Sequence, residues 1–229
     1  MNELTVQDLS LVVSRLPKDV VKMIKERGLI LGGGFIRATI AGEKPSDIDL
    51  FGKSKEQLEA AARALADDRF RAKFHETKNA FSVFSGVRMP VQFIFRWLFD
   101  TPDACMSSFD FTVAQAAVWF EDEHWHSVCH AQFYSDLAAR RLTYTSPIRN
   151  EDAGGSLLRV RKFLARGYNI QAQSLAAVTA RLFMAVEWGK IQTEEDASLI
   201  LCGLLREVDP LTVVDGIDIV DEHETKGGA

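Results

Sequence analysis

Glycines and aspartates that could handle phosphates lie close together in the stretch GGGFIRATIAGEKPSDIDLF, residues 32–51. The glycines follow an apolar run, and backbone N–H groups at such a bend can approach a phosphate closely where a helix begins. Asp47 and Asp49 are two positions apart, so on a strand both carboxylates point to the same face. A divalent cation stabilises two like charges held side by side, and Mg²⁺ is commonly bound by one or two carboxylates plus substrate phosphates. The stretch indicates a metal-dependent nucleotide site, with a simple turn and a solvated acid pair as the alternatives.

The same stretch resembles the head-domain signature of the DNA polymerase β-like nucleotidyltransferase superfamily, in its poly(A) polymerase and tRNA CCA-adding branch. That signature reads GGxVRDxLLGxxxxDxD. The matching positions, without a gap, are Gly33, Gly34, Ile36, Arg37, Gly42, Asp47 and Asp49. Ala38 stands where the family has an aspartate after the arginine. The strong resemblance covers residues 29–51, and it implies a nucleotidyltransferase head.

The resemblance also implies a mechanism for this stretch. Asp47 and Asp49 would hold two Mg²⁺ (or Mn²⁺) ions that activate a hydroxyl and stabilise leaving pyrophosphate. Gly33 and Gly34 would cradle the triphosphate of an NTP substrate. Arg37 would either support the phosphates or brace the fold, and both roles remain open. The implied reaction moves a nucleoside monophosphate to a hydroxyl, with an RNA 3′ end as the first acceptor to consider.

The superfamily usually supplies a third acid from a neighbouring strand, and two places compete for it. The strand VQFIF at 91–95 offers Gln92, which is a poor candidate because an amide binds Mg²⁺ less strongly than a carboxylate. Asp110 is the acid within the apolar stretch FDFTVAQAAVW, which resembles the RRDFTxNA motif of CCA-adding enzymes. Ser108 and Phe109 replace the two arginines of that motif. We predict Asp110 as the third catalytic and metal-binding acid, with a salt bridge to a helix as the alternative.

Between residues 140 and 166 the chain holds seven basic and two acidic residues, although the whole chain carries a net charge of −5. Arg159, Lys162 and Arg166 recur at helical spacing and would form one cationic stripe. This stripe is predicted to bind a triphosphate or an RNA backbone. A solvated helix face is the alternative.

The sequence predicts an α/β (α+β) fold, with a mixed twisted sheet flanked by helices and followed by a small helical region. Helices are expected over about 5–16, 17–28, 33–41, from 54, and over 132–140. Strands are expected at 29–31, 47–51, within 71–97 and at 125–130, and the stretch 109–119 is expected as a strand or as a strand entering a helix. The head would span 1–146, the helical region 147–210, and an acidic, flexible tail 211–229.

Composition limits the other function classes. With 47% hydrophobic and 26% charged residues, the 229-residue chain is typical of a globular protein, and its negative net charge argues against nonspecific nucleic-acid binding. Three scattered cysteines, no signal peptide and no membrane-spanning run predict a cytoplasmic protein. His124, His126, His130 and Cys129 leave a zinc site as a minor alternative. Two further hypotheses stay open, namely a protein or small-molecule acceptor and a catalytically silent binding protein.

Overall fold

A seven-stranded mixed sheet organises the protein. The computed structural model describes residues 2–86, 88–145 and 153–206. The strands run in the order β3-β4-β5-β2-β1-β6-β7. β2 and β5 are parallel, and the other neighbours are antiparallel. The strands are β1 (Ile30–Gly32), β2 (Ile48–Phe51), β3 (Lys73–Glu76), β4 (Ala80–Ser85), β5 (Arg88–Ile94), β6 (Ala116–Glu121) and β7 (His124–Cys129).

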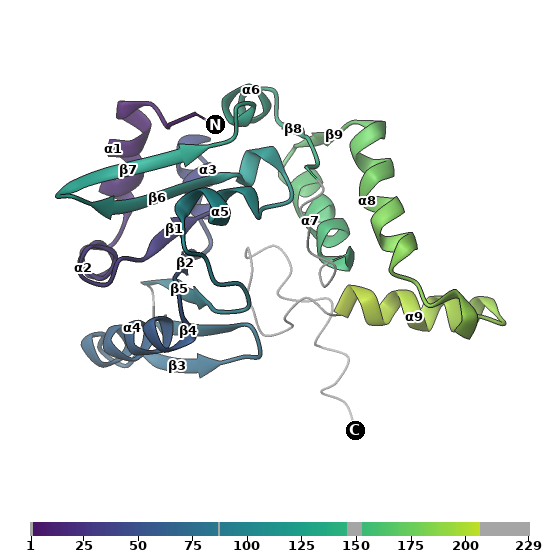
Figure 1. Ribbon diagram of the computed structural model, residues 1–229, viewed down its shortest axis with the longest axis horizontal. Helices are drawn as coiled ribbons and strands as arrows, with labels where there is room; N and C mark the ends of the chain where they lie inside the picture. Colours follow the sequence, from purple (N-terminus) through teal and green to yellow (C-terminus); the bar gives the residue numbers. More distant parts are fainter. Residues whose placement is uncertain (1, 87, 146–152, 207–229) are drawn as a thin grey trace.

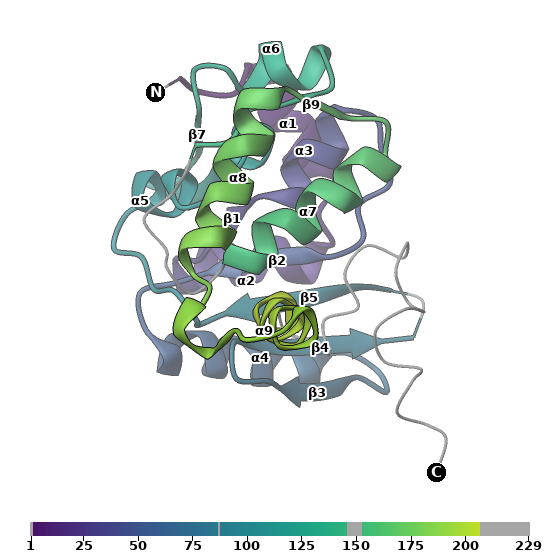
Figure 2. The same cartoon turned by 90° about the vertical axis from the view of Figure 1, so that its right-hand side faces the viewer.

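Helices flank this sheet, and the last three stand together (Figure 1). They are α1 (Val6–Arg15), α2 (Lys18–Arg27), α3 (Gly34–Ile40), α4 (Lys55–Asp68), α5 (Pro102–Ser107), α6 (Phe133–Ala138), α7 (Ala153–Ala165), α8 (Ala172–Met184) and α9 (Glu194–Arg206), with short 3-10 turns η1 (Thr112–Ala114) and η3 (Trp188–Lys190). Figure 2 shows α7, α8 and α9 in front of the sheet, with α1 and α2 behind it. The predicted fold class is confirmed.

Local chemistry explains the early helix boundaries. The Thr5 hydroxyl accepts a hydrogen bond from the Asp8 backbone N–H at the start of α1. Gly28 ends α2 in the left-handed conformation, which glycine adopts without steric cost. The Ser54 hydroxyl likewise caps α4 by accepting from the Gln57 N–H. These caps fix where the chain leaves each helix and enters β1 or the loop before α4.

The two faces of the sheet differ in polarity because side chains alternate along a strand. Ile48 and Leu50 of β2 are fully buried in the main core, which lies beneath α1–α4. Phe51 joins a smaller cluster on the opposite face, together with Cys105 and Met106 of α5. Asp49 therefore shares the face of Phe51. Asp49, the acid within β2, therefore lies on the face away from the main helical layer.

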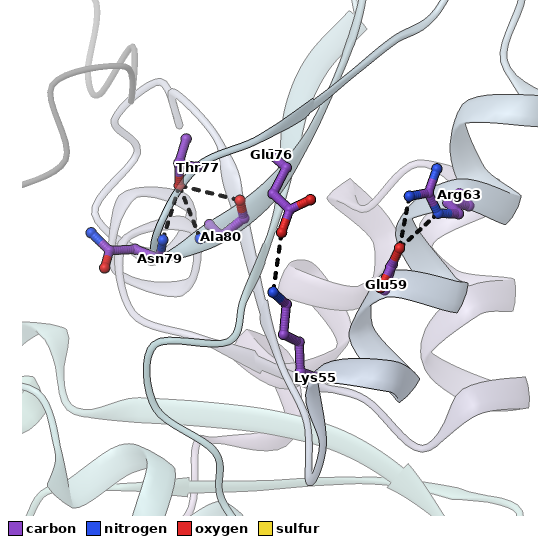
Figure 3. Close-up of polar contacts among 7 residues, drawn as sticks. All are labelled: Lys55, Glu59, Arg63, Glu76, Thr77, Asn79 and Ala80. Carbon is purple, nitrogen blue, oxygen red and sulfur yellow. Dashed lines mark hydrogen bonds and ion pairs between the residues drawn. The ribbon is translucent and has the colours of Figure 1, made fainter.

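The hairpin at the edge of the sheet is held by local polar contacts (Figure 3). Lys55 of α4 forms an ion pair with Glu76 of β3, with Nζ–Oε1 at 3.1 Å. The Thr77 hydroxyl accepts hydrogen bonds from the N–H groups of Asn79 and Ala80, which closes the turn between β3 and β4.

The stretch 109–119, expected as a strand or as a strand entering a helix, contains the short 3-10 turn η1, and only its second half forms the strand β6. The helical region expected at 147–210 packs against the head, since Val160, Phe163 and Val178 belong to the main core. The domain boundary itself stays a prediction. A short parallel pair, β8 (Arg141–Leu142) with β9 (Asn169–Ile170), also links the two parts.

The predicted tail, 211–229, lies outside the described residues. Within the described part of the chain, no helix has both the length and the apolar character needed to span a membrane.

Candidate functional site

Strand register brings the glycine bend and the acids together. β1 and β2 are antiparallel, and Gly32 pairs with Asp49. The bend at Gly33 therefore begins beside the aspartates, although 14 positions separate Gly33 from Asp47 in the sequence. The close relation that the sequence predicted between the bend and the acid pair is a consequence of this pairing.

Asp47 precedes β2 and is 7% exposed. Its Oδ1 accepts a hydrogen bond from the Ser46 hydroxyl at 2.8 Å. Its Oδ2 accepts one from Nε2 of Gln92 at 3.3 Å. Gln92 lies on β5, which is parallel to β2, and it pairs in register with Asp49. Gln92, which the sequence analysis set aside as a weak metal ligand, thus contacts Asp47 through its amide nitrogen.

Gly33 is required by conformation and by packing. It has a φ of +69°, in the region that favours glycine, and its N–H bonds to the Ala116 carbonyl at 3.2 Å. A Cβ at this position would lie 2.9 Å from the Phe109 ring. Gly34, by contrast, has open space where a Cβ would be. Phe109, which stands at an arginine position of the CCA-adding motif, thus packs against the bend.

Arg37 contacts Glu43 and the ring of Phe163. Its side chain is buried, and Nη2 lies 3.6 Å from Oε2 of Glu43. Its guanidinium also lies over the Phe163 ring of α7, 4.9 Å from the centroid. Tyr168 lies nearby, and its pKa is raised to about 12 by burial, opposed by Arg37 and reinforced by Glu43. The structure therefore gives Arg37 contacts that fit the bracing role left open by the sequence.

Asp110 is placed in a clamp between the head and α7. Its Oδ2 accepts hydrogen bonds from the Ser156 hydroxyl at 2.8 Å and from Arg159 Nη1. This is the salt bridge to a helix that the sequence analysis gave as the alternative. Asp110 faces α7 because the chain turns at η1 and does not continue as a strand through residues 109–119.

A second clamp went unnoticed in the sequence. Asp136 of α6 is fully buried, and its Oδ2 accepts a hydrogen bond from the Thr112 hydroxyl. Its Oδ1 accepts two from Arg141. Asp110 and Thr112 of the FDFT segment are therefore anchored on two different helices. A lone acid among apolar residues at 133–138 was the available signal.

The predicted cationic stripe of α7 is only partly present. Arg159 lies on the packed side of the helix, since Ser156, Val160 and Phe163 are buried there. Lys162 and Arg166 are half-buried. Arg140 donates to the Arg166 carbonyl at 2.8 Å, and Arg141 pairs with Asp136. At least three of the seven basic residues, Arg140, Arg141 and Arg159, thus bind other groups of this chain.

The candidate site offers two carboxylates as ligands for a hard cation. Asp47 and Asp49 offer carboxylate oxygens, which Mg²⁺ and Mn²⁺ prefer. However, no three His, Cys, Asp or Glu side chains among residues 2–86, 88–145 and 153–206 are grouped so that they could hold a metal ion. The described hydrogen bonds of Asp110 are with Ser156 and Arg159, and its role as the third ligand of the acid pair stays a prediction. The histidines near Cys129 form no such group either.

Known structures share this fold. The chain is similar to a Thermotoga maritima CCA-adding enzyme complexed with tRNA, with a TM-score of 0.55 at 19% identity, covering 76% of this chain and 45% of that one. A CCA-adding enzyme in complex with ATP gives a TM-score of 0.56 at 20% identity, covering 88% and 50%. The chain thus spans about half the length of these enzymes. The protein has a polymerase β-like nucleotidyltransferase fold, as the signature at 32–51 predicted.

The family assignment is more specific than the fold. Residues 3–140 match the Gabija anti-defense 2 family, and the chain belongs to that family. The match covers α1 to α6 and the whole seven-stranded sheet. None of the curated proteins matches the chain.

Proposed function

We propose that this protein is a metal-dependent nucleotidyltransferase that moves a nucleoside monophosphate from an NTP to a hydroxyl. The observation that carries the proposal is the register that sets Asp47 and Asp49 beside the Gly33 bend. The enzymes of similar fold include complexes with CTP and with ATP. The retained acid pair supports catalysis because two adjacent carboxylates are costly without a cation to bind.

Each residue of the candidate site would have a separate role in the proposed reaction. Asp47 and Asp49 would hold Mg²⁺ or Mn²⁺, which neutralises the triphosphate and activates the attacking hydroxyl. Ser46 would fix the orientation of the Asp47 carboxylate, and Gln92 would do so before nucleotide binds. The acceptor hydroxyl would lose its proton to solvent, and its oxygen would bond to the α-phosphorus. The bond between the α-phosphorus and the α,β-bridging oxygen would break, and pyrophosphate would leave.

The identity of the acceptor rests on fewer observations than the type of reaction. An RNA 3′ end was the first expectation, but Arg140, Arg141 and Arg159 make internal contacts, which weakens the basis for an RNA track. The family description refers to action against a defence system called Gabija. We therefore look for the acceptor hydroxyl among the components of that system, with RNA as the comparison.

The test uses each α-labelled NTP with Mg²⁺ or Mn²⁺. One arm adds total RNA, and a second adds the purified Gabija components. Transfer of label to either acceptor, lost in the double variant Asp47→Asn/Asp49→Asn, supports the enzyme. Transfer to RNA alone would move the acceptor back to the first expectation.

A non-catalytic binding protein is the second candidate. Two observations favour it, namely Phe109 packed against the bend and an amide beside Asp47 in place of an acid. Absence of label in every arm, together with unaltered anti-defence effect in Asp47→Asn/Asp49→Asn, would favour this candidate over the enzyme.

A further inference from the structure

Gln92 occupies an unusual position for an amide. It is 3% exposed and lies in β5 between Val91 and Phe93, both of which are fully buried. A buried polar side chain in an apolar strand is costly unless it is hydrogen-bonded. Its described partner is the Asp47 carboxylate, with Nε2–Oδ2 at 3.3 Å. The hydrogen bond to Asp47, a residue of the candidate metal site, therefore offsets the free-energy cost of burying Gln92.

The side-chain amide of glutamine can bind a carboxylate through its NH₂ group or a cation through its carbonyl oxygen. The NH₂ end donates to carboxylate oxygens, whereas the carbonyl oxygen has lone pairs that can bind a hard cation. Rotation about the last side-chain bond exchanges the two ends. The amide is neutral, so it adds no negative charge to the pair of aspartates. A glutamate at the same place would add one.

We infer that Gln92 makes cation binding at Asp47 and Asp49 depend on bound nucleotide. The inference rests on the proposed function. Without nucleotide, the amide nitrogen holds Asp47 Oδ2 and the site attracts a cation weakly. With an NTP, the triphosphate adds negative charge and oxygen ligands, the cation enters, and the amide turns its oxygen toward it. Gln92 is thus a positioning residue in the first state and a neutral ligand in the second.

The test measures Mn²⁺ binding by electron paramagnetic resonance, with and without a non-hydrolysable ATP analogue. We expect the analogue to tighten Mn²⁺ binding to the wild type by roughly tenfold or more. Gln92→Glu should bind Mn²⁺ without nucleotide roughly tenfold more tightly than the wild type, because a charged ligand replaces a neutral one. Its melting temperature should fall without metal and recover when Mn²⁺ is added.

Gln115→Glu is the matched control. Gln115 is also 3% exposed, and its amide donates to the Phe109 carbonyl and the Thr145 hydroxyl rather than to an aspartate. This variant should lose stability without gaining Mn²⁺ affinity. Equal Mn²⁺ affinities of Gln92→Glu and the wild type, or an equal gain in Gln115→Glu, would overturn the inference.

Gln92→Leu tests the ligand role if the glutamate variant does not fold. We expect its Mn²⁺ affinity in the presence of the analogue to fall roughly tenfold, and an unchanged affinity refutes the role. Asp47→Asn/Asp49→Asn separates the two proposals. If that variant loses Mn²⁺–analogue binding while the Gln92 variants match the wild type, only the inference on Gln92 fails. If the wild type binds no better than the double aspartate variant, the proposed function fails and the inference fails with it.

Discussion

Two groups of buried acids in this protein have different surroundings. Asp110 and Asp136 each accept hydrogen bonds from an arginine and a hydroxyl, and each ties the segment around η1 to a helix. Asp47 accepts from the Ser46 hydroxyl and the Gln92 amide, and it lies beside the glycine bend. An arginine partner on a packed helix satisfies a carboxylate permanently, whereas neutral donors can yield to a cation. We therefore expect Asp110 and Asp136 to stabilise the fold, and we expect Asp47 to act in the chemistry proposed above.

The largest effect should come from the acid pair. Asp47→Asn/Asp49→Asn should lower nucleotidyl transfer by roughly a thousandfold or more, because a bound metal supplies several kcal/mol of transition-state stabilisation. Initial rates with labelled NTP measure this loss. Urea unfolding should show a much smaller change than for the clamp acids. A large loss of stability with full activity would reverse the comparison.

Asp136→Asn should show the opposite pattern. Asp136 is fully buried, so weakening its pair with Arg141 should cost about 3 kcal/mol in the free energy of unfolding. Chemical denaturation followed by circular dichroism measures this cost. Asp67→Asn, at an exposed position of α4, is the control and should change stability by less than about 0.5 kcal/mol. A similar small change in Asp136→Asn would show that the clamp is not structural.

The variant Asp110→Asn tests most directly whether Asp110 has a structural or a catalytic role. We expect a loss of roughly 2 kcal/mol, because a hydrogen-bonded charge facing Arg159 and Ser156 is removed. Ser156→Ala should cost about half as much, since one neutral donor is removed. Catalytic rates should stay within about tenfold of the wild type, well short of the loss expected for a metal ligand. Abolished metal-dependent transfer with unchanged stability would instead restore Asp110 as the third acid predicted from the sequence.

Asp19 provides a reference for a paired acid outside both groups. Burial raises its pKa, but the hydrogen bond and charge of Arg69, aided by Arg88, outweigh burial and place the pKa below its ordinary value of 3.8. Its contribution to stability is therefore complete above that value and is lost as the pH falls through the lowered pKa. Asp19→Asn should cost about 1 kcal/mol at neutral pH, and the difference should shrink only below about pH 4.

Unfolding curves of wild type and Asp19→Asn between pH 2 and 7 measure this dependence. A constant difference down to the lowest pH would show that the ion pair with Arg69 does not stabilise the protein.

Part of the fold could be predicted because its signals are local. The caps at Thr5 and Ser54, the left-handed Gly28 and the alternation around Asp49 depend on neighbouring residues. The placement of Asp110 could not be predicted in the same way. The stretch 109–119 reads as continuous in polarity, but packing against α6 and α7 breaks it at η1. Its partners Ser156 and Arg159 lie more than forty residues away.

The sequence alone determined the acid pair and the glycine bend, because spacing fixes which side chains share a strand face and where a bend needs glycine. The nucleotidyltransferase fold was implied by the resemblance of residues 29–51 to the superfamily signature. The tertiary structure decided the partners. Parallel pairing of β2 with β5 brought Gln92 to Asp47, and the docking of α7 turned Asp110 and Arg159 toward each other. These contacts join segments that are far apart in the sequence, and sequence separation does not predict which distant segments meet in the folded chain. A carboxylate's role depends on what it contacts, which only the folded chain defines.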